Sequence, residues 1–140
     1  MAYSFTDIYR PLRTLLRLNG LVIGLGFGLL LLFLPQAVLL RWGLLLSGPA
    51  WPVRLAGALL VTLGVFWLLS ASDEIIGRTT LITTLIGHSL IAIVLLVAYL
   101  QREITALAPV GLLLLAVVFI LCLVGALLPL RYLRADYHTL

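Results

Sequence analysis

Charge is what this sequence has least of. Only 10% of its 140 residues are charged, whereas 64% are hydrophobic, and the mean hydropathy is +1.26. A soluble domain of this size is about half apolar, because water has to wet its surface. A soluble fold of this chain would have almost no polar surface, so the predicted solvent is lipid and the chain is expected to be an integral membrane protein.

The chain contains one cysteine and no lysine. The single cysteine, Cys122, lies in the apolar run VVFILCLVGALL. One cysteine forms no internal disulfide, which excludes a redox enzyme built on a cysteine pair, and apolar surroundings predict an unreactive thiol. All nine basic residues are arginine, and the net charge is +4. We attribute this charge to arginines beside the membrane that set orientation and contact anionic lipids, rather than to nucleic-acid binding.

What the chain does have is long uncharged runs. Four of them predict membrane-spanning helices at about residues 12–34, 55–72, 79–101 and 104–130, each long enough, or nearly so, to cross the hydrocarbon layer. The segment 36–50 is apolar but too short to cross, so an interfacial or re-entrant position is expected. The predicted fold is a single all-α domain, a four-helix membrane bundle with an antiparallel up-down arrangement.

Arginine counts predict the orientation of this bundle. With four spans, both termini share a side with the connection between the second and third spans. That side carries six arginines and the other side three, which favours cytoplasmic termini in a bacterial inner membrane. The expected lipid and topology anchors are Arg10, Arg13, Arg17, Arg131, Arg134, Trp42 and Trp51, with Trp67 as an aromatic anchor at the inner edge.

The first run contains four glycines, in NGLVIGLGFGLLLLFLP. A dinucleotide fingerprint would need a preceding strand, a helix beginning at the glycines and a third glycine at the right spacing, none of which this segment offers. Instead, Gly20, Gly24 and Gly28 are spaced by four and predict a groove on one helix face, where another backbone approaches closely. Gly57 and Gly64 offer matching small positions on the second helix. The partner in this groove is either that helix or a helix of another protein.

Polar residues within the spans are few, and the third span has the richest set. Thr80, Thr84 and His88 repeat every four residues and form one stripe. A structural, hydrogen-bonded His88 is the favoured interpretation; the alternatives are a haem or quinone contact and proton chemistry. Bis-histidine haem ligation needs a second histidine at the same depth, and the other one, His138, lies in the tail. No metal site is predicted.

The first half of the chain resembles the DoxX-like small four-helix bacterial membrane proteins. The similarity lies in RLNGLVIGLGFGLLLLFLP, a glycine-rich first helix that ends in proline, and in RLAGALLVTLG, where Arg54 and Gly57 form an Arg-x-x-Gly start to the second helix. It covers about half of the chain, and the second half adds no signature. The resemblance implies a four-helix bundle and little specific chemistry.

The absence of a catalytic constellation or an acidic residue within a span favours a non-enzymatic function. We expect an accessory or structural subunit of a larger bacterial membrane complex, specifically a respiratory or photosynthetic electron-transfer complex. Its expected partners are other integral membrane subunits and lipids, with no soluble small-molecule substrate and no nucleic acid. The alternatives are a small homo-oligomeric transporter or channel lined by Thr80, Thr84 and His88, and a redox subunit in which His88 contacts haem or quinone.

Overall fold

A computed structural model describes residues 9–73 and 76–137. The regular structure in these ranges is entirely helical. Its elements are α1 (Arg10–Asn19), the π-helix η1 (Gly20–Phe27), α2 (Gly28–Phe33), α3 (Gln36–Arg41), α4 (Trp51–Ser70), α5 (Arg78–Leu100), the 3-10 helix η2 (Glu103–Ala106) and α6 (Pro109–Tyr137). Four helices are long and apolar enough to cross a membrane, as the sequence predicts. The first of them is continuous from Arg10 to Phe33, and we call α1, η1 and α2 together the first span.

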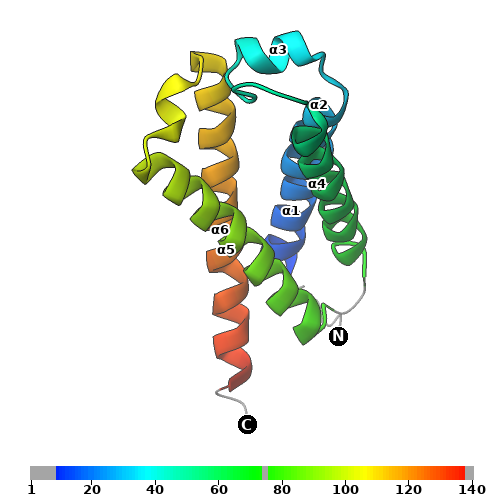
Figure 1. The fold of residues 1–140 in the computed structure, drawn as a ribbon. Coiled ribbons are helices and arrows are strands. Elements are labelled where there is room, and N and C mark those ends of the chain that lie inside the picture. Colours follow the sequence, from blue (N-terminus) through cyan, green and yellow to red (C-terminus); the bar gives the residue numbers. More distant parts are fainter. Residues whose placement is uncertain (1–8, 74–75, 138–140) are drawn as a thin grey trace, which may run out of the picture.

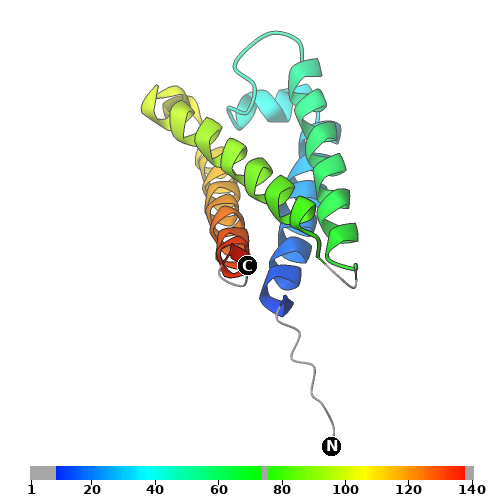
Figure 2. The same ribbon diagram turned by 90° about the horizontal axis from the view of Figure 1, so that it is seen from below.

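The long helices form two pairs. The first span packs along α4, and α5 packs along α6. Figures 1 and 2 show that the pairs lie close together near the beginning of α1 and the end of α6, and diverge toward the opposite end. The short helix α3 lies across that opposite end in both views, in the segment for which an interfacial position is expected.

Prolines set several helix boundaries. Pro11 and Pro52 lie in the first turns of α1 and α4, where a missing N–H leaves no bond unmade. Leu34, directly before Pro35, is extended, with ψ 138°, because a proline disfavours the helical conformation of the residue that precedes it. Pro35 thereby ends the first span and turns the chain into α3.

The last helix differs most from its predicted range of 104–130. Residues 103–106 form η2, and α6 begins at Pro109. The same helix continues past Pro129 to Tyr137, because a charged residue ends an apolar run without ending a helix. For the same reason α4 begins at Trp51, before Arg54, and not at residue 55.

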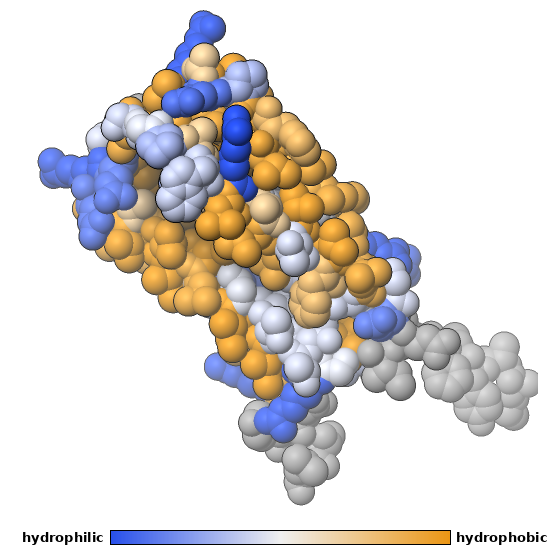
Figure 3. Space-filling view, turned by 45° about the vertical axis from the view of Figure 1, so that its right-hand side comes forward, coloured by the Kyte–Doolittle hydropathy of each residue, from blue (hydrophilic) through white to orange (hydrophobic). Residues whose placement is uncertain are grey.

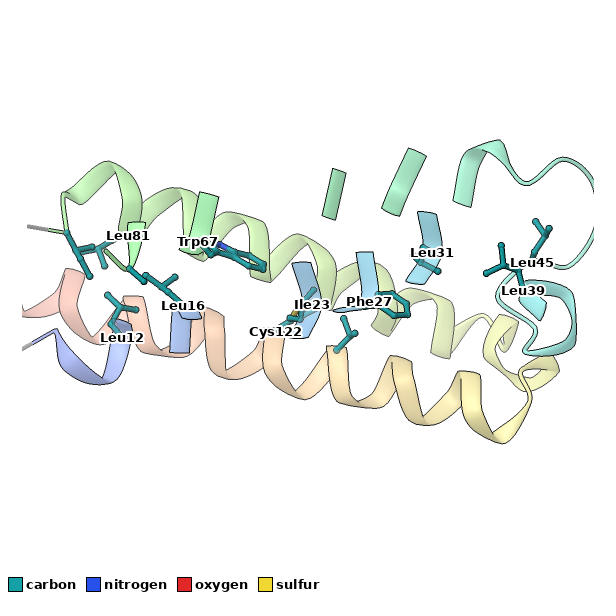
Figure 4. Packing of buried hydrophobic residues seen from close by; sticks show 14 of the residues in the cluster. Leu12, Leu16, Ile23, Phe27, Leu31, Leu39, Leu45, Trp67, Leu81 and Cys122 are labelled. Atoms are coloured by element: carbon teal, nitrogen blue, oxygen red, sulfur yellow. The ribbon is translucent and has the colours of Figure 1, made fainter. Parts of the chain in front are cut away.

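Buried leucines and aromatic residues connect the two helix pairs. Leu12, Leu16, Ile23 and Phe27 follow one side of the first span, and Trp67, Leu81 and Cys122 join the same cluster from α4, α5 and α6 (Figure 4). At the α3 end, Leu39 is fully buried, and the Ala108 N–H donates to the Trp42 carbonyl at 3.2 Å. These contacts join α3 and the segment after it to the start of α6.

Candidate functional site

His88 lies on α5, about 15 Å along the helix from Arg78, and none of its surface is exposed. Its Nδ1 atom lies 2.8 Å from the carbonyl oxygen of Thr84, one turn earlier on the same helix. Because a carbonyl oxygen only accepts hydrogen bonds, Nδ1 is assigned as the protonated, donating nitrogen. The helix that carries His88 thus fixes the tautomer of its ring.

The other ring nitrogen bonds to a different helix. His88 Nε2 lies 2.6 Å from Nδ2 of Asn19, the last residue of α1, and both side chains are buried. A neutral imidazole with its proton on Nδ1 accepts at Nε2, so the Asn19 amide donates. The same amide nitrogen donates to the Leu121 carbonyl of α6 at 3.4 Å. Asn19 therefore links the first span to both α5 and α6.

Residues of α4 and α6 pack against the two faces of the His88 ring. The Trp67 indole of α4 stacks on the imidazole with ring centroids 4.2 Å apart and planes 17° apart. Gly125 of α6 lies against the same ring, and a methyl group at that position would be 2.7 Å from its Cγ atom. We call Asn19, Trp67, Thr84, His88 and Gly125 the polar junction, because it is the place where all four long helices meet.

Three polar atoms of the polar junction have no hydrogen-bond partner within residues 9–73 and 76–137: Asn19 Oδ1, Trp67 Nε1 and Thr84 Oγ1. The side chains that carry them are 0–1% exposed. The junction therefore presents one acceptor, one donor and one hydroxyl beside a fully enclosed imidazole. Its chemistry is that of neutral hydrogen bonding, with no carboxylate among its members.

The geometry bears directly on a cofactor at His88. Both ring nitrogens are already bonded within the chain, so a haem iron at Nε2 would have to displace Asn19. His138, the other histidine, lies outside the described residues. No cluster of three or more His, Cys, Asp or Glu side chains able to hold a metal ion occurs in the part of the chain that the structure describes.

The stripe on α5 becomes progressively more buried along the helix. Thr80 is half-buried, Thr84 is 1% exposed and His88 is fully enclosed. The two hollows found between α5 and α6 are lined by other residues, toward the far end of these helices. The stripe thus faces packed helices rather than either of these hollows.

The three spaced glycines face α4. A methyl group at Gly20 would lie 2.9 Å from the Gly64 carbonyl oxygen, and one at Gly28 would lie 3.1 Å from the Gly57 carbonyl oxygen. At Gly24 it would collide with the Gly64 Cα atom. These glycines, together with Gly57 and Gly64, form a backbone-to-backbone contact that we call the glycine seam. Helix α4 of the same chain therefore fills the groove.

The predicted anchors are exposed or half-buried with one exception. Arg10, Arg17, Arg131, Arg134 and Trp51 are exposed, and Arg13 and Trp42 are half-buried. The exception is Trp67, which is expected as an aromatic anchor but is fully buried and stacks on His88, so its indole contacts neighbouring helices and not lipid. The sequence around it suits a lipid-facing or a buried indole equally well, and the packing against α5 distinguishes the two.

Comparison with known proteins adds no relative: no family model, no curated protein and no solved structure matches this chain. The assignment of the site therefore depends on the geometry of this chain alone. Sequence reasoning identified His88 and Thr84 but missed Asn19, Trp67 and Gly125 as their neighbours. The contact between Asn19 and His88 could have been predicted from Asn19. A buried amide within a span requires a polar partner, and His88 is the strongest hydrogen-bonding side chain in the other spans.

Proposed function

We propose that this chain is a non-catalytic accessory subunit of a larger bacterial membrane complex, a multi-pass protein of the cytoplasmic membrane. The main observation behind the proposal is that groups of the same chain enclose the imidazole of the polar junction. Its imidazole bonds through both nitrogens to groups of the same chain, and its faces are covered by Trp67 and Gly125. Such a residue joins helices, whereas a catalytic or ligand-binding histidine needs an accessible nitrogen.

The outer surface supports the same function. Large apolar side chains point outward from α4 and α6, including Leu59, Leu69 and Leu113, which are 63%, 65% and 66% exposed. Figure 3 shows hydrophobic residues over most of the middle of one face, with hydrophilic groups toward both ends. This surface suits lipid and the helices of partner subunits.

The placement of the glycine seam narrows where a partner subunit would bind. Because α4 fills the groove, we assign partner contacts to the outward faces of α4, α5 and α6 and not to the spaced glycines. In this proposal the bundle has an antiparallel up-down arrangement with both termini in the cytoplasm. The complex is a respiratory or photosynthetic electron-transfer assembly, and the DoxX-like resemblance is compatible with such a small helical subunit.

Gentle purification from native membranes tests this function. A tagged chain, solubilised in a mild detergent, should retain at least one other membrane protein in fixed stoichiometry through size exclusion. Mass spectrometry identifies the partner, and an untagged strain serves as the control. Recovery of the chain alone after equally gentle treatment would contradict the accessory function.

Two further measurements separate the alternative functions. The purified chain should show no visible absorption band of its own; a band that disappears in His88→Ala would establish a redox subunit. Liposomes that contain only this chain should show no solute flux above that of empty liposomes. Flux that Thr84→Val abolishes would establish a transporter or channel.

A further inference from the structure

Two adjoining hollows lie between α5 and α6, at the end where η2 connects these helices. The first has a volume of about 340 Å³, and its walls are almost entirely apolar; they include Leu95, Leu96, Leu115, Ala116 and Phe119. The second has a volume of about 590 Å³ and includes Arg102 and Thr105. Tyr99, Ile104 and Leu112 line both, so the two hollows are direct neighbours.

The two hollows differ in polarity. Leu112 and Phe119 are seven residues apart on α6, so the apolar wall extends about 10 Å along the helix. The only polar atom that a lining side chain can offer in the first hollow is the Tyr99 hydroxyl. Hydrocarbon therefore suits the first hollow, whereas the second is mostly apolar and also presents the polar groups of Arg102 and Thr105.

Arg102 is held in place at the polar end. Its backbone is left-handed, with φ 60°, the only positive φ of a non-glycine residue in the described ranges. Such a conformation is unfavourable for a residue that carries a Cβ atom. The Arg102 carbonyl accepts a hydrogen bond from the Thr105 hydroxyl at 2.6 Å, and the Arg102 N–H donates to the Tyr99 carbonyl at 3.1 Å. These bonds fix the turn that places the arginine directly after the span.

The charge of Arg102 is available to a ligand. Neither Arg102 nor its acidic neighbour Glu103 forms an ion pair with any residue in 9–73 or 76–137, and both are exposed. A guanidinium recognises phosphate well, because its planar fork donates two parallel hydrogen bonds. An arginine at a membrane surface also attracts anionic lipid headgroups over the distance of a Debye length.

We propose that these two neighbouring hollows together bind a phospholipid with an anionic headgroup. One acyl chain occupies the apolar hollow between α5 and α6, and the headgroup phosphate lies on Arg102 in the second hollow. Charge complementarity selects the anionic lipid over a zwitterionic one. The proposal requires only the fold and holds with or without a partner subunit.

Native mass spectrometry of the purified chain from mixed micelles tests the headgroup contact. With equal amounts of phosphatidylglycerol and phosphatidylcholine that carry identical acyl chains, the retained lipid should favour phosphatidylglycerol about fivefold. That ratio corresponds to the roughly 1 kcal/mol that one arginine contributes near anionic lipid. In Arg102→Gln the ratio should fall to about one, and in Arg102→Lys it should largely return. Arg54→Gln is the matched control, because Arg54 is exposed at the same end and lines neither hollow.

A second variant tests the acyl-chain contact. Ala116→Trp fills the apolar hollow and should reduce the retention of both lipids, whereas Val117→Trp, on the neighbouring exposed position outside the hollow, should not. Circular dichroism and size exclusion establish whether each variant is folded. If Ala116→Trp is unfolded, the arginine variants alone test the proposal. Preference for phosphatidylglycerol that survives in Arg102→Gln overturns the proposal, as does tighter retention of an uncharged isoprenoid or of a second copy of the chain. None of these outcomes depends on the partner sought under the proposed function.

Discussion

At the scale of single residues, the polar junction shows how a few polar atoms specify one arrangement of apolar helices. Lipid gives helices no hydrophobic reason to associate, so close packing and hydrogen bonds between helices decide which faces meet. Asn19 bonds to His88 at 2.6 Å, and each group is fully buried, so loss of Asn19 leaves His88 Nε2 unpaired and loss of His88 leaves one N–H of the Asn19 amide unpaired. The pair therefore opposes rotation or sliding of the first span against α5.

Removal of either partner should cost more than removal of both. We expect Asn19→Leu and His88→Leu each to lower the free energy of unfolding by about 1–3 kcal/mol, because each leaves a buried polar group unsatisfied. The double variant should lose less than the sum of these two values. Unfolding in mixed micelles with increasing dodecyl sulfate measures the three differences.

Thr62→Val is the control for this experiment. Thr62 is exposed, and its hydroxyl bonds only to the Ala58 carbonyl of its own helix at 3.0 Å. The substitution should change the unfolding free energy by less than either single variant of the pair. Strict additivity of Asn19→Leu and His88→Leu would show that the two side chains are not energetically coupled.

At the scale of helices, the spans themselves could be predicted from hydropathy, whereas their ends and partners could not. Apolar length identifies a helix in lipid because every backbone group must bond within the segment. The charged residues used as boundaries mark where the membrane ends, so α4 and α6 extend beyond Arg54 and Arg131. Which helix fills a groove depends on contacts between residues far apart in the sequence, as between Gly24 and Gly64.

The π-helical turn is a further feature that residue spacing does not reveal. Residues Gly20–Phe27 form η1, in which each turn takes more residues than the 3.6 of an α-helix. Gly20, Gly24 and Gly28 all lie against α4. Gly26 is exposed instead.

The glycine seam predicts opposite results for two neighbouring glycines. Gly24→Ala places a methyl group against the Gly64 backbone and should destabilise the protein by about 1–3 kcal/mol, the usual cost of overpacking. Gly26→Ala is the matched control, because a methyl group there meets only the Leu21 carbonyl of its own helix, at 3.2 Å. It should be neutral or slightly stabilising, since alanine favours helix. Thermal unfolding in detergent measures both, and equal losses would exclude a specific seam.

At the scale of the whole molecule, two different kinds of contact join the helix pairs. The polar junction joins all four long helices, nine residues after the start of the first span and ten after the start of α5. At the end where the pairs diverge, α3 and the Trp42–Ala108 hydrogen bond connect them (Figure 1). The hollow proposed to hold lipid lies on α5 and α6 at that same end. Polar contacts thus join the helices within the spans, and the proposed lipid site lies where the helix pairs separate.

The distribution of arginine over these two ends predicts the orientation of the molecule in the membrane. Six arginines belong to the end with the chain termini and the α4–α5 connection, and Arg41, Arg54 and Arg102 belong to the other. Ser72 and Ser47 are exposed in connections at these respective ends. In intact bacterial cells, a membrane-impermeant maleimide should label Ser47→Cys and leave Ser72→Cys unlabelled until the cells are lysed. The wild-type chain is the control, because its only cysteine, Cys122, is fully buried. Labelling of Ser72→Cys alone in intact cells would show the opposite orientation. The six arginines would then lie outside the cell, against the bias that positive charge imposes during insertion.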